Sequence, residues 1–391
     1  MKQTVYTRDV VLLMAAAFFY MCCSNSVAPI VAGYAESIGA SSFWMGLISS
    51  LTTATAVVCR PVTGNLADKM DKRPLVVAGC LMMVAASAGY VLFPHVWCVA
   101  VLRVLHGTGY ACCSIGMSTW LTLLLPPDRL ASGVGAYGTV NALAMALAPV
   151  MGIRLKEFFG YRSSFLAAGF SALICILLVH LIGNCGAPVS SGKKRAESAV
   201  RRLVVPGAVP IAAALAIITI PYTANKSFLV SYVDRAQLEI APDLFFSFYA
   251  VILVVLRMAL RKQYDRVPYP RFLVLCTISM LGSMAALYWM RGYALMLLGA
   301  VLMAAGYGIM YSVSQSAAAS AAPPEQRGLA MGTYYLGLDI GSAVGPIVGG
   351  ILYGNAAPGA FYPLLGVIGA LCFVMYLPCK RVCGQNNSVH T

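Results

Sequence analysis

Residues 60–73 read RPVTGNLADKMDKR, and residues 257–270 read RMALRKQYDRVPYP. The second stretch begins 197 positions after the first, and matched residues recur at this offset over about ninety positions without a gap. The pairs are Arg60 with Arg257, Asp68 with Asp265, Lys69 with Arg266, Gly109 and Tyr110 with Gly306 and Tyr307, Pro126 and Pro127 with Pro323 and Pro324, Tyr137 with Tyr334, Pro149 with Pro346, and Gly152 with Gly349. A single shared offset indicates an internal repeat.

Around these stretches, twelve apolar runs approach or exceed the length a helix needs to cross about 30 Å of hydrocarbon, which takes about twenty residues. They are Val10 to Tyr34, Phe43 to Arg60, Pro74 to Phe93, Trp97 to Leu125, Ser132 to Ile153, Ser163 to Gly183, Val204 to Tyr232, Leu244 to Leu260, Arg271 to Met290, Tyr293 to Ala322, Leu329 to Tyr353 and Phe361 to Leu377. The chain is 60% hydrophobic and only 10% charged, whereas a soluble domain is about a quarter charged. The sequence therefore predicts an all-α integral membrane protein with twelve transmembrane helices.

The longest hydrophilic connector is basic and divides the chain into residues 1–183, a linker of residues 184–203, and residues 204–391. Each flanking part carries six of the predicted helices. Because an even number of spans separates the matched positions of the repeat, the two halves have the same orientation. Parallel halves related by an axis along the membrane normal are typical of transporters that rock around a site between them.

The net charge of +14 has a membrane explanation. With a cytoplasmic N-terminus, 20 of the 27 Lys and Arg residues fall on the cytoplasmic side, as the positive-inside rule requires. We therefore expect a multi-pass protein of the cytoplasmic membrane with both termini in the cytoplasm, and no nucleic-acid partner. The seven exceptions are Arg103, Arg154, Lys156, Arg162, Lys226, Arg235 and Arg291.

Other function classes lack their sequence signals. Most of the 13 cysteines lie in apolar runs without metal-type CxxC pairs, which is typical of reduced core residues rather than disulfides or a metal site. The sequence contains no HExxH, GxSxG or GxxxxGK motif. We expect neither an enzyme nor an ATP-driven pump, and no cofactor.

The segment from Gly64 to Arg73 resembles the cytoplasmic signature loop of the major facilitator superfamily (MFS), and the resemblance covers nearly the whole chain. The segment departs from the signature at Asp71, where the family usually has glycine, and the second copy has Arg261 in the glycine position. The resemblance implies a monomeric transporter in which this loop latches the cytoplasmic side. The gating residues would be Gly64, Asp68, Lys69, Arg73, Asp265 and Arg266. Gly64 would permit close backbone approach, although a basic retention loop with an incidental aspartate remains an alternative.

Three ionisable residues inside predicted spans are candidates for proton coupling, because such groups are costly in a membrane. Asp339 is the only carboxylate deep in any span, and an apolar setting favours the protonated carboxyl that a proton carrier needs. Arg103 begins an Arg-x-x-x-Gly pattern which, by the same resemblance, implies proton coupling or anion recognition, and His106 lies one turn later. The alternatives are helix packing for Asp339 and His106 and snorkelling to the outer interface for Arg103.

In the resembled family, helices one, four, seven and ten line the substrate cavity. Here the candidates from those helices and from helices five and eleven are Tyr20, Asn25, Tyr110, Ser114, Asn141, Asn225, Lys226, Tyr311, Ser314, Gln315, Tyr334 and Tyr335. This aromatic and amphipathic set suits a small amphipathic organic compound better than a phosphate ester or a peptide. Packing is the alternative for each tyrosine, and snorkelling is the alternative for Lys226.

Small residues and prolines in two spans predict close helix contacts and bends. The residues concerned are Pro149, Gly341, Gly345, Pro346 and Gly349. The resemblance places the full motif in helix five of antiporters, whereas here it lies in helix eleven.

The leading hypothesis is a secondary transporter that exports small amphipathic compounds, drug-like or metabolite, in exchange for protons. Its partners would be the substrate, the proton and the lipid bilayer. A facilitator or importer without proton coupling is the second interpretation, and a transporter-like sensor is a third.

Overall fold

The computed structural model describes residues 7–125, 130–187, 205–260, 267–321, 327–355 and 358–387. Every regular element in those ranges is helical, as expected where lipid leaves each backbone polar group to be satisfied inside its own segment. Eleven helices among the described residues are long and apolar enough to cross a membrane. The longest, α6, contains two of the predicted spans, so the prediction of an all-α membrane protein with twelve spans is confirmed.

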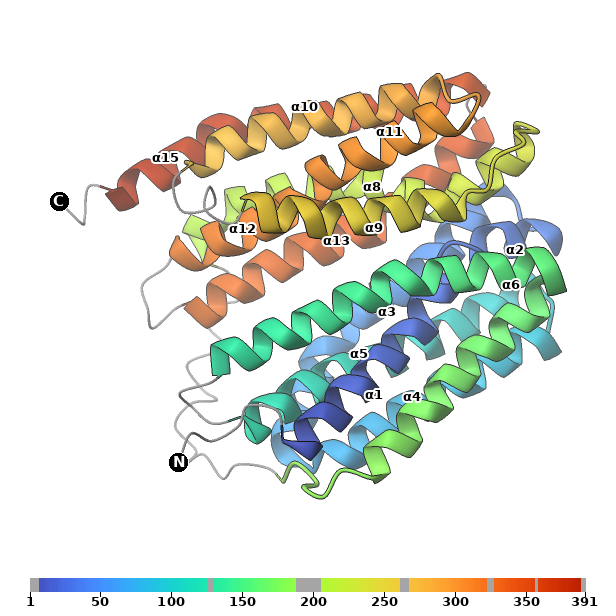
Figure 1. The fold of residues 1–391 in the computed structure, drawn as a ribbon, viewed down its shortest axis with the longest axis vertical. Helices are drawn as coiled ribbons and strands as arrows, with labels where there is room; N and C mark the ends of the chain where they lie inside the picture. Colours follow the sequence, from blue (N-terminus) through green and yellow to red (C-terminus); the bar gives the residue numbers. More distant parts are fainter. Residues whose placement is uncertain are drawn as a thin grey trace. The chain divides into compact units, whose positions relative to one another are not determined.

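The chain divides into two compact units, Met1–Ser190 and Ser191–Thr391. Figure 1 shows unit 1 from blue to green and unit 2 from yellow-green to red. Unit 1 contains α1 (Arg8–Val27), α2 (Val31–Ser37), α3 (Ser42–Lys69), α4 (Lys72–Leu92), α5 (Val96–Leu124) and α6 (Leu130–His180). Unit 2 contains η2 (Pro206–Ala208), α8 (Val209–Arg235), α9 (Asp243–Leu260), α10 (Tyr269–Tyr288), α11 (Tyr293–Met303), η3 (Ala304–Gly308), α12 (Ile309–Ser320), α13 (Arg327–Asn355), η5 (Pro358–Ala360), α14 (Phe361–Ala370), η6 (Leu371–Met375) and α15 (Tyr376–Asn387). Most of the predicted linker lies outside the described residues.

In unit 1, α1 packs along α6, and α5 packs against both α3 and α4. Large aromatic side chains fill the space between these helices, and Tyr90, Trp120 and Phe165 are fully buried. The contact between α1 and α6 is close because Gly152 has no side chain, and an added Cβ would clash with the carbonyl of Ser26.

In unit 2, α8 packs along α13, the counterpart of the α1–α6 pair. A Cβ added to Gly341 would lie 2.5 Å from the Ala216 carbonyl oxygen, and one added to Gly345 would lie 2.7 Å from that of Ile220. The close helix approach expected at these glycines is therefore present. Pro346 lies inside the same helix, as Pro149 lies inside α6.

Two predicted spans are interrupted in ways that the apolar pattern does not reveal, and α6 is broken between two predicted spans. The first span is two helices, α1 and α2, separated by a turn at Ala28–Ile30 that contains Pro29. Within α6 the helix breaks at Gly160, between the spans predicted from Ser132 to Ile153 and from Ser163 to Gly183, and a residue with a side chain rarely adopts its φ of 80° and ψ of 176°. The tenth span contains one turn of π-helix, η3.

The predicted signature loop is mostly helical, which corrects the sequence interpretation. Helix α3 continues to Lys69, so only Met70 and Asp71 connect it to α4. A Cβ added to Gly64 would meet nothing within 4 Å, so the close backbone approach expected there is absent from the described contacts.

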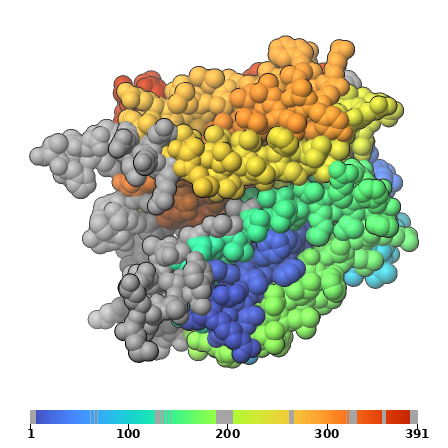
Figure 2. Space-filling model, viewed as in Figure 1, coloured from blue at the N-terminus to red at the C-terminus, as the bar shows by residue number. Residues whose placement is uncertain are grey.

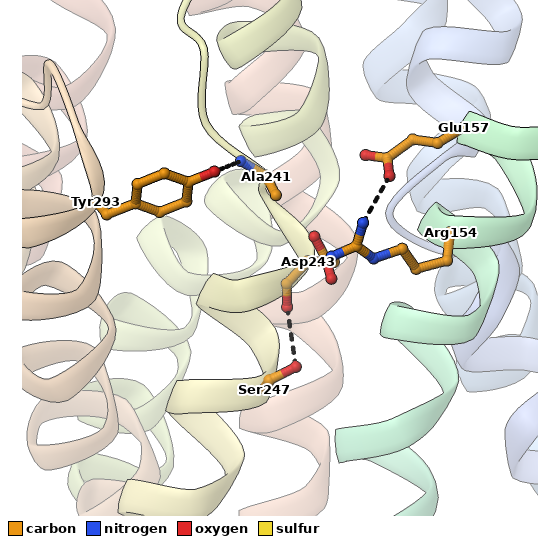
Figure 3. Close-up of polar contacts among 6 residues, drawn as sticks. All are labelled: Arg154, Glu157, Ala241, Asp243, Ser247 and Tyr293. Atoms are coloured by element: carbon orange, nitrogen blue, oxygen red, sulfur yellow. Dashed lines mark hydrogen bonds and ion pairs between the residues drawn. The ribbon is translucent and has the colours of Figure 1, made fainter.

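Helix α9 shows how unit 2 places polar groups at a helix end and apolar groups along the helix. At its start, the Ser247 hydroxyl donates to the Asp243 carbonyl at 3.2 Å, and the Ala241 amide donates to the Tyr293 hydroxyl at 3.2 Å (Figure 3). Figure 3 also shows the Arg154–Glu157 ion pair of unit 1, with an N···O distance of 3.6 Å.

Farther along, α9 forms much of the yellow surface in Figure 2. The exposed side chains of this helix are apolar, as expected of a lipid-facing helix. They include Phe248, Val251, Val254, Val255 and Met258.

Candidate functional site

Six tyrosines from five helical segments of unit 2 form what we call the tyrosine cluster. They are Tyr222 of α8, Tyr249 of α9, Tyr307 of η3, Tyr311 of α12, and Tyr334 and Tyr335 of α13. The rings of Tyr222 and Tyr307 stack with centroids 3.8 Å apart and an interplanar angle of 12°. Tyr249 lies 5.6 Å from Tyr222, and Tyr311 lies 6.3 Å from Tyr307, so one chain of ring contacts joins residues far apart in sequence.

Local backbone geometry sets the position of Tyr307. The residue lies in the π-helical turn η3, a kind of turn that is often found at functional sites. Gly306 lets this turn approach α10, because an added Cβ would lie 3.0 Å from the Cys276 carbonyl oxygen. The turn therefore presses against α10 while its tyrosine stacks on α8.

Hydrogen bonds fix the α12–α13 side of the cluster. The Tyr334 hydroxyl donates to the Tyr311 carbonyl oxygen at 3.0 Å, and its ring contacts that of Tyr335 at 5.0 Å. The Gln315 side-chain amide donates to the Tyr335 hydroxyl at 3.4 Å. The structure thus brings together four of the predicted cavity residues: Tyr311, Gln315, Tyr334 and Tyr335.

Two charged side chains border the cluster. The Arg257 guanidinium lies over the Tyr311 ring, 6.0 Å from its centroid, as in a cation–π contact. Asp339 is only 6% exposed, and its carboxyl lies near enough to Tyr307 to act on that hydroxyl electrostatically. An acid and a base therefore flank the aromatic surface.

Sequence reasoning missed Tyr222, Tyr249, Tyr307 and Arg257 as site residues. Two signals were available. Tyr307 stands between two glycines at a position matched in the repeat, and Arg257 lies within the span predicted from Leu244 to Leu260 although we assigned it to the cytoplasmic side.

In unit 1, the predicted cavity residues form a smaller group. The Tyr20 and Tyr137 hydroxyls lie 3.5 Å apart, and the Tyr20 ring lies 6.1 Å from that of Tyr110. Asn141 is half-buried, and its side-chain oxygen has no hydrogen-bond partner among the described residues.

Two other predicted cavity residues of unit 1 bond to their own helices. The Asn25 side-chain amide donates to the Met21 carbonyl at 3.0 Å, and the Ser114 hydroxyl donates to that of Ala111 at 3.2 Å. These hydrogen bonds occupy donor groups that could otherwise bind a substrate.

Arg103 faces α3 and does not snorkel. It is 3% exposed, and its Nε and Nη2 donate to the carbonyls of Ile48 at 3.0 Å and Ser49 at 3.2 Å. His106 is fully buried and stacks on Tyr90 with centroids 6.3 Å apart. Neither ring nitrogen of His106 has a hydrogen-bond partner among the described residues. Arg103 and His106 therefore lie in the core of unit 1, whereas Tyr110 of the same helix lies beside Tyr20 of α1.

Asn225 is also a correction. It is fully buried, accepts a hydrogen bond from Tyr362 at 3.2 Å and donates to the Met303 sulfur at 3.8 Å. These partners join α8 to α11 and α14, so this side chain packs the core of unit 2 rather than lining a cavity. Lys226, its neighbour on α8, is half-buried.

The residues predicted to form the cytoplasmic latch are only partly described. Arg73 donates a hydrogen bond to the carbonyl of Ile182, at the end of α6, and Lys69 is exposed. The Asp68 side chain and both Asp265 and Arg266 lie outside the described part of the chain. The described contacts therefore connect Arg73 to the start of the linker.

Comparison with known proteins identifies the family. A sequence profile of the Major Facilitator Superfamily matches residues 13–294 and 243–388. The multi-drug resistance efflux pump PmrA of Streptococcus pneumoniae is 26% identical over 212 residues, which cover 53% of this chain and 49% of PmrA. This match therefore spans about half the length of PmrA. The uncharacterised MFS-type transporter YhhS of Escherichia coli is 23% identical over 368 residues, covering 90% of this chain and 88% of YhhS.

Solved structures agree on the fold. The nucleoside transporter NupG superposes with a TM-score of 0.82 at 10% identity, covering 96% of this chain and 99% of NupG. A peptide transporter POT in complex with alafosfalin superposes with a TM-score of 0.77 at 15% identity, covering 96% of this chain and 94% of POT. The profile covers most of the described helices, and the chain therefore belongs to the Major Facilitator Superfamily and is a membrane transporter rather than an enzyme.

Proposed function

We propose that the chain exports small amphipathic organic compounds across the cytoplasmic membrane by alternating access, in exchange for protons. The observation that carries the proposal is the tyrosine cluster bordered by Asp339, because an aromatic surface with few polar groups suits such a compound. The half-length similarity to the efflux pump PmrA supports export. The excess of Lys and Arg in the segments assigned to the cytoplasm supports a topology with both termini inside.

Asp339 is the proposed proton carrier. A carboxyl inside a membrane span is costly when charged and therefore marks a proton or substrate pathway. Its position on α13, within electrostatic range of Tyr307, allows a ligand contact at Tyr307 to alter the environment of the acid. Proton release and ligand binding would then be coupled within one unit.

Reconstitution into proteoliposomes tests transport directly. We expect fluorescent amphipathic dyes to move only when a pH gradient is imposed in the direction that drives exchange. Equilibration of dye without any gradient would instead support a facilitator, and binding without movement would contradict transport.

A further inference from the structure

Arg257 is a cation of unit 2 with a buried Nε that donates no hydrogen bond to the part of the chain that the structure describes. Its guanidinium lies over the face of Tyr311, 6.0 Å from the ring centroid. The residue is half-buried, so a ligand can still approach it. A guanidinium withdrawn from water favours an acceptor or an anion, because desolvated charges are costly when they lack one.

The acid that borders the same cluster differs in this respect. Asp339 already takes part in interactions within the described chain, whereas Arg257 forms no hydrogen bond or ion pair there. The charged group at the cluster that lacks a partner is therefore the cation, which favours a negatively charged ligand. A ligand that supplied a positive charge would leave the guanidinium in the same unsatisfied state.

The rings beside Arg257 restrict the rest of the ligand. Arg257 is on the same helix as Tyr249, and its charge is within electrostatic range of Tyr249 and Tyr307. An aromatic or apolar body would rest on these rings while its acidic group met the guanidinium. Arg offers a planar pair of donors that matches a carboxylate, which accepts two parallel hydrogen bonds.

We propose that the tyrosine cluster binds an organic acid, with its carboxylate on Arg257 and its apolar body against Tyr307 and Tyr311. This inference rests on the proposed transport function and names the substrate class of the same site. Arg257 is thus a specificity-determining residue, and a doubly charged phosphate ester is disfavoured because Asp339 lies beside the same rings.

Three probes that share one ring system test the charge preference. The full chain is purified in detergent and titrated calorimetrically with 2-naphthoate, 2-naphthamide and 2-naphthylmethylammonium, with empty micelles as the blank. We expect the naphthoate to bind at least about tenfold tighter than the amide, as a hydrogen-bonded ion pair implies. Naphthoate binding that is absent or weaker than amide binding would overturn the proposal without any variant. Binding of the ammonium probe that is tighter than naphthoate binding would overturn it as well.

Variants then assign the preference to one residue. Arg257→Gln should abolish the preference for naphthoate while leaving amide affinity within about twofold, and Arg257→Lys should keep part of it because a point charge remains. Lys380→Gln, which removes an exposed charge from α15, is the matched control and should change nothing. A naphthoate preference that survives in Arg257→Gln would contradict the assignment.

Transport of the same probes separates this inference from the proposed function. Arg257-dependent binding of naphthoate without movement into proteoliposomes would contradict transport but support the proposed binding site for an organic acid. Movement of the amide and ammonium probes with no preference for the acid would contradict the proposed acid-binding site but support transport.

Discussion

The carboxylate of Asp9, in the first turn of α1, accepts backbone hydrogen bonds from Gly183 at 3.2 Å and Asn184 at 3.1 Å. Gly183 and Asn184 lie just after the end of α6, 174 and 175 positions from Asp9 along the chain. The Trp120 ring nitrogen donates to the Asn184 carbonyl at 3.0 Å, and the Arg73 amide donates to that of Cys185 at 3.3 Å. The start of the predicted linker is therefore fixed to unit 1 by α1, α4 and α5.

Loss of the Asp9 carboxylate should release this segment. In Asp9→Ala two amides lose a charged acceptor, a strong kind of hydrogen bond, so we expect Cys185, which is half-buried, to react several-fold faster with a maleimide. Site-specific labelling followed by mass spectrometry measures the rate. Glu239→Ala, an exposed acid of unit 2, is the control. Equal Cys185 rates in wild type and Asp9→Ala would show that the carboxylate does not hold the segment.

Two glycines of α13 should respond oppositely to alanine. Gly341→Ala places a Cβ against the α8 backbone, and overpacking of this kind costs about 1–3 kcal/mol. In Gly332→Ala the new Cβ meets nothing within 4 Å, so the better helix propensity of alanine should preserve or raise stability. Melting temperatures in detergent compare the pair. A Gly341→Ala protein as stable as Gly332→Ala would argue against close α8–α13 packing.

Arg103 should be needed for stability whatever its part in transport. Replacement by Gln removes at least one hydrogen bond from a charged group to α3, and we expect the free energy of unfolding to fall by about 2 kcal/mol. Lys380→Gln removes an exposed charge from α15 and should have little effect. Thermal unfolding of the two variants gives the comparison. Normal stability of Arg103→Gln with defective transport would favour the proton-coupling role implied by the family resemblance.

The aromatic stack of Tyr222 and Tyr307 should contribute to ligand affinity. Tyr307→Leu removes a ring but keeps an apolar side chain, so the affinity for an aromatic ligand should fall roughly two- to tenfold. Tyr307→Phe should bind within about twofold of wild type. Tyr288→Leu, which changes a residue 41% exposed at the end of α10, is the control for general effects on folding. Calorimetric titration of the folded variants gives the affinities, and unchanged affinity in Tyr307→Leu would exclude the stack from the site.

The lengths of the apolar runs were enough to predict the membrane spans. The run predicted from Trp97 to Leu125 is α5, Val96–Leu124, and the run predicted from Leu244 to Leu260 is α9, Asp243–Leu260. Hydropathy reports where a helix enters and leaves an apolar layer, but it does not report whether the backbone inside is regular. The break at Gly160 falls in the gap predicted between Ile153 and Ser163, whereas the π-helical turn at Ala304–Gly308 depends on tertiary packing and could not be inferred from hydropathy.

The candidate site was only partly predictable, for a related reason. Tyr311, Gln315, Tyr334 and Tyr335 were selected because their helices resemble cavity-lining helices. Asn225 was selected on the same basis but packs against Tyr362, since the face a residue presents depends on helix rotation, which sequence alone leaves open. Contacts such as that of Tyr222 with Tyr307 join separate helices, so no spacing along the chain records them.

Proton exchange at Asp339 is the central claim, and proton release on ligand binding tests it most directly. Purified protein in a weakly buffered detergent solution is mixed with a panel of amphipathic cations, anions and neutral compounds, and the pH change is recorded for wild type and for Asp339→Asn. The account predicts release by the wild type and none by the variant, with ligand still bound by both. Equal proton release by the two proteins, or ligand binding without release by either, would contradict it.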